Sequence, residues 1–267
     1  MLEITRIIFL LTIFAPAAGA PSVRTEWIGI PGQRTKAKIF EQSRTGKQIL
    51  AVILHGDAPF TKPSYQYLFA QKLAEAFPQV VAVALLRPGY MDIEGDTSDG
   101  NRGNATADNY TPEVIQQLDS AATRLKEELH PSFVVLVGHS GGAAIAADMM
   151  ARDPKLADAA LLVSCPCDVP AFRDHMKTIA PTPLWNEPVR SISPLSAVDY
   201  MPRNIAIRLI VGERDNVAPP VLAERYARAL QKHGIGAQLS VLAGRGHEIL
   251  LDKDVVEEFG KLVRHLS

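Results

Sequence analysis

The stretch LVGHSGGAAIAADMM, from Leu136 to Met150, decides the fold of this chain. A run of aliphatic residues ends at a serine between glycines, and an alanine-rich segment follows at once. The aliphatic run is typical of a buried strand, and the alanine-rich segment is typical of a helix. A serine at so sharp a strand-to-helix corner has a strained backbone, which predicts that its hydroxyl is exposed beyond the end of the strand.

The same alternation of strand and helix patterns extends along most of the chain. Continuous apolar runs predict six buried strands, near residues 47–56, 79–89, 132–140, 158–165, 205–212 and 237–244. Helical spacing predicts helices near residues 63–77, 111–129, 219–232 and 252–265, besides the one after the serine. Apolar strands that alternate with helices indicate an α/β domain, here residues 21–267, with a mainly parallel sheet covered on both faces.

Composition excludes several classes of protein. The 267 residues are 47% hydrophobic, enough for a large core, and the formal net charge is −1. A charge so close to zero implies no broad attraction to nucleic acid or to an anionic membrane. The sequence contains no zinc-ligand spacing, no basic tract and no internal repeat, so we expect no nucleic-acid partner.

The first residues, MLEITRIIFLLTIFAPAAGAPS, are typical of a secretory signal peptide. The apolar stretch is too short to span a bilayer comfortably, and the small residues after it fit a cleavage site. We therefore expect residues 1–20 to be removed and the mature chain to be periplasmic or extracellular, without stable membrane insertion. A buried first strand or an uncleaved anchor is the alternative.

Two segments interrupt the strand–helix alternation. Residues 89–109 form a long polar stretch rich in Gly, Asp and Asn. Residues 166–202 contain several prolines, short helical patterns and the aromatic residue Trp185. Long connections in compact domains tend to be functional or mobile, so we expect residues 166–202 to form a small cap over the site, with a disordered linker as the alternative.

The chain has two cysteines, Cys165 and Cys167, separated by one proline. Residues two apart on an extended chain point the same way, so a local disulfide is feasible but strained. Two free thiols, or a weak metal contact, are the other interpretations.

The pentapeptide GHSGG, Gly138 to Gly142, has the pattern G-x-S-x-G. Side chains at Gly138 or Gly142 would strike the neighbouring strand or helix, so both positions must stay small. The following helix adds its N-terminal N–H groups, which favour negative charge nearby. The pattern predicts that Ser140 is a nucleophile beside an anion site.

A serine nucleophile needs a base and an orienting carboxylate. Asp215 follows one later strand and His247 follows the next, in the chain order serine, acid, histidine. Because the carboxyl ends of parallel strands meet at one edge of a sheet, we expect the three side chains to converge. Asp215 is preferred to Glu213, which is nearer the strand, and Asp168 is the alternative acid.

The developing oxyanion of the tetrahedral intermediate needs hydrogen-bond donors. The backbone N–H of Gly141 is one expected donor, and the N–H of Asp57, in the loop after an earlier strand, is the other. We expect Gly56 to give that turn its freedom and His55 to brace the loop rather than to act as a base. The Asp57 carboxylate would oppose an oxyanion unless it points away or is paired.

With these residues in place, the sequence resembles the α/β-hydrolase superfamily over about residues 48–265. The resemblance rests on His55-Gly56, on GHSGG, on GERD ending at Asp215 and on GRGH ending at His247. Residues 193–220 also look like the C-terminal region of prolyl-oligopeptidase-type serine peptidases, which usually carry a propeller domain that these 267 residues do not contain. The resemblance implies a mostly parallel sheet of about eight strands, with Ser140 as nucleophile, His247 as base and Asp215 as its partner.

The implied reaction is a two-step acyl transfer that needs no cofactor and no metal. A carboxylic ester or thioester is the expected bond, carried by a small-molecule or peptide-like substrate. A small exported peptidase or amidase on the same machinery is the first alternative, and a non-catalytic binding protein on the same scaffold is the second.

Overall fold

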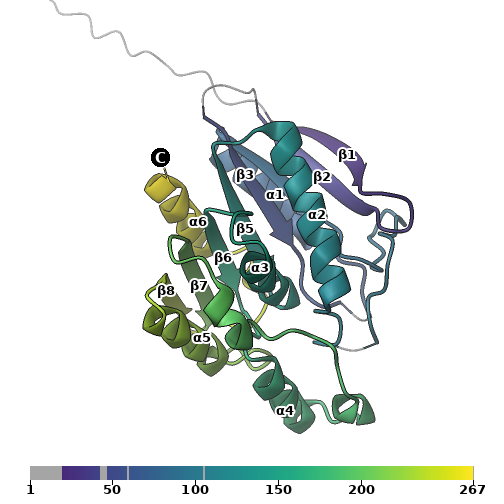
Figure 1. Ribbon diagram of the computed structural model, residues 1–267, viewed down its shortest axis with the longest axis vertical. Helices are drawn as coiled ribbons and strands as arrows, with labels where there is room; N and C mark the ends of the chain where they lie inside the picture. The colour runs from purple at the N-terminus through teal and green to yellow at the C-terminus, as the bar shows by residue number, and fades with distance from the viewer. Residues whose placement is uncertain (1–19, 43–46, 59, 105, 267) are drawn as a thin grey trace, which may run out of the picture.

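The computed structural model describes residues 20–42, 47–58, 60–104 and 106–266. Its strands form one sheet in the order β1-β2-β4-β3-β5-β6-β7-β8 (Figure 1). β2 runs antiparallel to its neighbours β1 and β4, and every other pairing in the sheet is parallel. This confirms the expected mostly parallel sheet of about eight strands. The strands are β1 (Ser22–Ile28), β2 (Thr35–Glu41), β3 (Ile49–Leu54), β4 (Val80–Leu85), β5 (Phe133–His139), β6 (Ala159–Val163), β7 (Ala206–Gly212) and β8 (Gly236–Leu242).

Helices cover both faces of this sheet. Helices α1 and α6 pack on one face, and α2, α3 and α5 pack on the other. The helices are α1 (Tyr65–Ala76), α2 (Pro112–Leu129), α3 (Gly141–Arg152), α4 (Val169–Ile179), α5 (Pro220–Lys232) and α6 (Lys253–Leu266). Two short 3₁₀ helices, η1 (Pro183–Asn186) and η2 (Pro194–Tyr200), follow α4.

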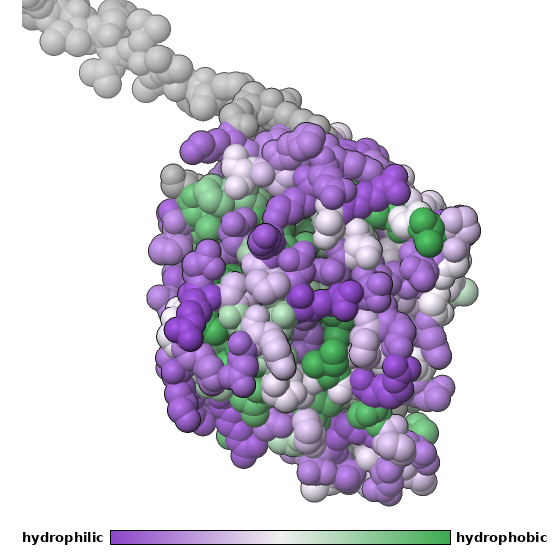
Figure 2. All heavy atoms as spheres, in the orientation of Figure 1, coloured by the Kyte–Doolittle hydropathy of each residue, from purple (hydrophilic) through white to green (hydrophobic). Residues whose placement is uncertain are grey.

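The two cores follow from the alternation of side chains along each strand. In β3, Leu50, Val52 and Leu54 join the core beneath α2, α3 and α5. Their neighbours Ile49, Ala51 and Ile53 join the core beneath α1 and α6. A strand buried on both faces must be apolar at every position, which is why β3 reads as an unbroken aliphatic run. The view in Figure 2 shows mainly hydrophilic surface, interrupted by small hydrophobic patches.

The six strands expected from apolar runs are all present, but β1 and β2 escaped the pattern. Both lie at one edge of the sheet and carry charged residues along their length. In β2, Lys36 has an exposed fraction of 0%, although lysine is among the residues least often buried. Its charge masks the apolar pattern of a strand whose other residues are mostly buried.

Most of the predicted signal peptide lies outside the described residues, so its removal stays a prediction. Within the ranges that the structure describes, no helix combines the length and apolar character needed to cross a membrane.

The segment 166–202 is folded around several buried side chains. Phe172 and Met176 of α4 and Trp185 of η1 belong to the same core as α2, α3 and α5. The guanidinium of Arg173 donates to the carbonyls of Leu184, Trp185 and Glu187, which holds η1 against α4. The role of this segment as a cap stays a prediction. At its start, Cys165 and Cys167 form a disulfide, the first of the three alternatives.

Candidate active site

The corner after β5 has the geometry that the sequence predicts. Ser140 has φ 52° and ψ −123°, a conformation that non-glycine residues rarely adopt and that costs about 1–3 kcal/mol. A Cβ on Gly138 would lie 2.4 Å from Cα of Ala143, and one on Gly142 would lie 2.4 Å from the His55 carbonyl oxygen. Strand, helix and the loop after β3 therefore approach so closely that only glycine fits at these two positions.

Three side chains from three different loops meet beyond the carboxyl ends of the strands. Nε2 of His247 lies 3.0 Å from Oγ of Ser140. Nδ1 of the same ring lies 2.8 Å and 3.0 Å from the two carboxylate oxygens of Asp215. Asp215 follows β7 and His247 follows β8, so the parallel sheet brings together residues separated by up to 107 positions.

The carboxylate of Asp215 is itself held in place. Its Oδ1 accepts hydrogen bonds from the backbone N–H groups of Val217 (3.0 Å) and Ala218 (2.8 Å). The residue is 3% exposed, and its contact with Nδ1 of His247 is correspondingly sheltered from water. Because two backbone N–H groups hold Oδ1 and the side chain is buried, the carboxylate of Asp215 stays in the orientation that faces the imidazole.

The other candidate acids lie elsewhere. Asp168 is the N-cap of α4, where it accepts from the N–H of Ala171 and pairs with Arg225 at 3.1 Å. Glu213 accepts a hydrogen bond from the N–H of Gly244. The structure therefore places Asp215, and neither of the alternatives, against His247.

The loop after β3 lies against the start of α3. Gly141 is the first residue of α3, and the N–H groups of a first helical turn have no acceptor within the helix. A Cβ on Gly141 would lie 2.4 Å from Oδ1 of Asp57, so the expected oxyanion donors belong to adjacent segments.

The Asp57 carboxylate is paired, which is one of the two conditions under which it would not oppose a nearby oxyanion. Its Oδ1 lies 2.9 Å from Nη1 of Arg87, and its Oδ2 accepts from the hydroxyl of Tyr110 (2.6 Å) and the N–H of Ala107 (2.9 Å). The Arg87 side chain has an exposed fraction of 0%, so its positive charge interacts with close neighbours such as Asp57 and not with water. A buried carboxylate that is neutralised in this way exerts little repulsion on a nearby oxyanion.

His55 braces this loop, as expected. Its Nε2 accepts from the N–H of Arg87 (3.0 Å), so the ring proton is on Nδ1, which donates to the carbonyl of Gly56 (2.7 Å). Burial lowers the pKa of His55 well below its usual value, and the charge of Arg87 adds to the effect. The ring is neutral and fully engaged.

Sequence reasoning missed the residues that surround this machinery. Tyr65, Ser164 and His139 contact the loops that carry Gly56 and His247, and Arg87 and Tyr110 hold Asp57. His139 stands inside the G-x-S-x-G pattern, but its position there says nothing of its partners. The remaining residues come from other loops and from the start of α1, and could be found only once the chain was folded.

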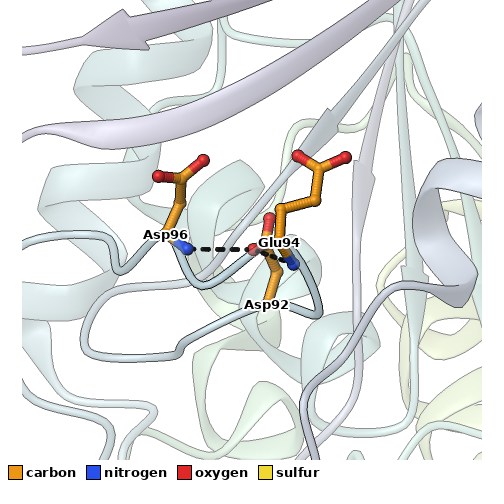
Figure 3. Close-up of side chains that lie close together, drawn as sticks. All are labelled: Asp92, Glu94 and Asp96. Atoms are coloured by element: carbon orange, nitrogen blue, oxygen red, sulfur yellow. Dashed lines mark hydrogen bonds between the residues drawn. The ribbon is translucent and has the colours of Figure 1, made fainter.

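A cluster of acidic side chains lies in the loop after β4. Asp92, Glu94 and Asp96 point into one small region, with ligand atoms within 4.8 Å of one another (Figure 3). Nζ of Lys36 lies 2.6 Å from a carboxylate oxygen of each. An ammonium has three N–H donors, so the three carboxylates use all of them. Burial opposes the charged form of Lys36, but these hydrogen bonds outweigh it and raise its pKa. A side chain of this protein therefore fills the centre that a cation would need.

Comparisons with known proteins agree with this architecture. The profile described as "Alpha/beta hydrolase family" matches residues 51–200, more than half of the chain. That range contains Ser140 but ends before Asp215 and His247. No protein of curated function matches the chain in sequence.

Solved structures share the fold at low sequence identity. Est1E from Butyrivibrio proteoclasticus, with ferulic acid bound, is 14% identical, with a TM-score of 0.70 over 90% of this chain and 98% of that one. A puromycin-hydrolyzing peptidase of Mycobacterium tuberculosis is 18% identical, with a TM-score of 0.70 over 96% of this chain and 40% of that one. The acylaminoacyl peptidase of Pyrococcus horikoshii is 13% identical, with a TM-score of 0.67 over 93% of this chain and 41% of that one. This chain thus spans less than half the length of these peptidases and nearly the whole length of Est1E.

Proposed function

Because the chain belongs to the alpha/beta hydrolase family, we propose that it is a serine hydrolase that cleaves a carboxylic ester or thioester. The observation that carries this proposal is the line of contacts from the carboxylate of Asp215, through both ring nitrogens of His247, to Oγ of Ser140. A carboxylate, an imidazole and a hydroxyl in this order form the arrangement that activates a serine.

In the first half of the reaction, Oγ of Ser140 attacks the substrate carbonyl carbon while its proton passes to Nε2 of His247. Asp215 accepts the Nδ1 proton in a hydrogen bond and stabilises the imidazolium that forms. The N–H groups of Gly141 and Asp57 donate to the oxyanion of the tetrahedral intermediate, where losing one such donor costs about 3–4 kcal/mol.

In the second half, the bond to the leaving group breaks as Nε2 gives its proton to the departing oxygen or sulfur. The acyl group is then on Ser140. A water molecule loses a proton to Nε2 and attacks the acyl carbon. The bond from that carbon to Oγ of Ser140 then breaks as Nε2 returns the proton to Oγ, so the acid is released and the enzyme regains its starting protonation state.

We prefer an ester to a peptide as the substrate because the similar peptidases are much longer than this chain, whereas Est1E is of nearly the same length. Est1E, whose structure contains ferulic acid, matches this chain over 98% of its own length. The similarity to acylaminoacyl and puromycin-hydrolyzing peptidases supports a peptidase or amidase as the second candidate. Both candidates use the same serine chemistry on a small-molecule or peptide-like substrate.

Labelling with a fluorophosphonate probe tests the assignment of Ser140. We expect wild-type protein to be labelled and Ser140→Ala to be unlabelled, with loss of nitrophenyl ester hydrolysis in the same variant. Absence of labelling in folded wild-type protein would favour the non-catalytic alternative. Nitrophenyl esters and aminoacyl anilides, compared by kcat/KM, separate the esterase from the peptidase.

We also propose that the protein is exported. The apolar N-terminal pattern of residues 1–20 and the disulfide between Cys165 and Cys167 support this, since disulfides persist mainly in oxidising compartments. Intact-mass measurement of the protein recovered from its native cell is the test. A chain that retains residues 1–20 in the cytosol would contradict export.

A further inference from the structure

We propose that Tyr65 and His139 form a buried pair of positioning residues that ties the loop of the oxyanion donors to the loop of His247. The proposal rests on the function proposed above and adds two residues to it. Neither residue belongs to the predicted nucleophile, base and acid, and neither is required to touch the reacting atoms.

A continuous chain of hydrogen bonds connects the two loops. The N–H of Gly56 donates to the hydroxyl oxygen of Tyr65 (2.6 Å), and that oxygen lies 2.9 Å from Nδ1 of His139. At the other side of the ring, Nε2 of His139 lies 3.1 Å from the backbone carbonyl oxygen of His247. Tyr65 begins α1 and His139 ends β5, so two rigid elements supply the connecting side chains.

The donors and acceptors in this chain can be assigned. A backbone N–H can only donate, so the Tyr65 oxygen accepts from Gly56 and its own proton is free for Nδ1 of His139. A carbonyl oxygen can only accept, so Nε2 of His139 carries the ring proton. Burial lowers the pKa of His139 to about 4, and the nearby charge of His247 adds to the effect. The ring is therefore neutral at ordinary pH, with one defined tautomer.

The carbonyl of His247 receives two further hydrogen bonds. Oγ of Ser164, in the loop after β6, and the backbone N–H of Ile249 each donate to the same oxygen at 3.0 Å. His247 lies in an irregular stretch between β8 and α6, where no helix or strand pairing orients the backbone. The Ile249 bond is local to this stretch, whereas His139 and Ser164 tie the carbonyl to the ends of β5 and β6, so these two side chains set the direction of the His247 peptide relative to the sheet.

The same chain orients the oxyanion loop. Gly56 has no room for a side chain, because a Cβ there would lie 2.9 Å from Cβ of Ser140 and 3.0 Å from the Tyr65 hydroxyl. The N–H of Gly56 is held by the Tyr65 hydroxyl, and the next residue is Asp57, whose N–H is the proposed oxyanion donor. Tyr65 and His139 thus fix the position of the base, His247, relative to the loop that carries the oxyanion donor. A displacement of about 1 Å in such a site can cost about 100-fold in rate.

Two substitutions of His139 separate positioning from packing. His139→Gln keeps a donor near the Nε2 position, whereas His139→Asn keeps a polar group only near the Nδ1 position. We expect His139→Asn to lower kcat by about tenfold or more with KM changed less than about twofold, and His139→Gln to recover most of that loss. A residue that only fills space would give similar rates for both variants.

Tyr65→Phe tests the other half of the pair, and Tyr226→Phe is its matched control. Tyr226 is fully buried in α5, and among the described residues its hydroxyl has no hydrogen-bond partner. We expect kcat to fall about three- to tenfold in Tyr65→Phe and to stay near wild type in Tyr226→Phe. Because Tyr65 and His139 act through one chain, Tyr65→Phe combined with His139→Asn should lose about as much as His139→Asn alone.

The outcomes distinguish this proposal from the function on which it rests. Ser140-dependent hydrolysis by wild-type protein, with Tyr65→Phe and His139→Asn both within about twofold of it, would overturn the pairing and leave the serine hydrolase intact. Wild-type protein without Ser140-dependent hydrolysis would overturn both. Melting temperatures of all variants identify any loss due to unfolding, and Ser164→Ala provides a second, milder removal of a donor from the His247 carbonyl.

Discussion

Replacing Asp215 with asparagine should trap His247 in the wrong tautomer. The N–H groups of Val217 and Ala218 donate to Oδ1 of Asp215 at 3.0 Å and 2.8 Å. They can only donate, so the amide oxygen of the asparagine takes the Oδ1 position and its NH₂ takes the Oδ2 position, 2.8 Å from Nδ1 of His247. An NH₂ group can only donate, so Nδ1 becomes the acceptor and the ring proton moves to Nε2, opposite Oγ of Ser140.

A protonated Nε2 cannot take the proton of Ser140, so the loss falls on the chemical step. We expect kcat to fall by about 10³–10⁴, which corresponds to about 4–5.5 kcal/mol of transition-state stabilisation. The substitution is nearly isosteric, so KM and the melting temperature should change little. Steady-state hydrolysis of a nitrophenyl ester, with thermal unfolding of the same preparation, measures all three quantities.

Asp168→Asn is the matched control for this substitution. Asp168 is also a carboxylate that follows a strand of the sheet, but it caps α4 and forms a partly exposed ion pair with Arg225. Its amide should keep activity within about threefold of wild type, because an exposed ion pair contributes little. If Asp215→Asn kept more than a tenth of wild-type kcat, or if Asp168→Asn lost as much as Asp215→Asn, the reasoning from the two fixed N–H groups would be refuted.

Three further substitutions test the interior of the fold. Lys36→Met removes the ammonium from three converging carboxylates and should destabilise by about 3–5 kcal/mol; Ca²⁺ should then raise the melting temperature of the variant more than that of wild type, and equal responses would contradict the assignment. Gly142→Ala places a Cβ 2.4 Å from the His55 carbonyl and should cost at least about 1–3 kcal/mol in chemical denaturation, together with most of the activity; a stable, active variant would show that the corner can relax. Asp148 is 3% exposed, neither of its oxygens has a hydrogen-bond partner among the described residues, and burial raises its pKa well above the usual value. A raised folded-state pKa favours folding at low pH, and this contribution is lost as pH rises above the ordinary carboxyl range. Asp148→Asn should therefore gain stability relative to wild type between pH 4 and pH 8, by at most about 1.4 kcal/mol per pH unit, and a pH-independent difference in unfolding free energy would argue against a buried neutral acid.

The extent of prediction from sequence can be followed in particular elements. β3, β4 and β6 are buried on both faces, so each must be apolar throughout, and an apolar run of that length can be recognised in the sequence without knowledge of its neighbours. β2 could not be read in this way. Its Lys36 is buried only because Asp92, Glu94 and Asp96 surround it from a loop that lies 56 to 60 residues later.

The candidate site also contains some residues that could be predicted from the sequence and others that could not. The corner at Ser140 is local, because the sharp turn needs glycines two residues to either side, and this spacing is visible in the sequence. The convergence of Asp215 and His247 could be expected because parallel strands end at one edge. By contrast, the partners of His139 could not be inferred, because its two hydrogen bonds join residues 74 and 108 positions away.

The sequence by itself therefore determined the strand–helix alternation, the strained serine corner and the edge of the sheet at which three polar side chains gather. Only the tertiary structure decided the strand order, the presence of β1 and β2, the paired state of Asp57 and the hydrogen bonds that hold the His247 loop. The physical reason is the range of the interactions. Apolar periodicity and turn geometry act between residues close in the chain, whereas a buried charge or a buried ring nitrogen is satisfied by whichever distant group the packed fold brings within about 3 Å.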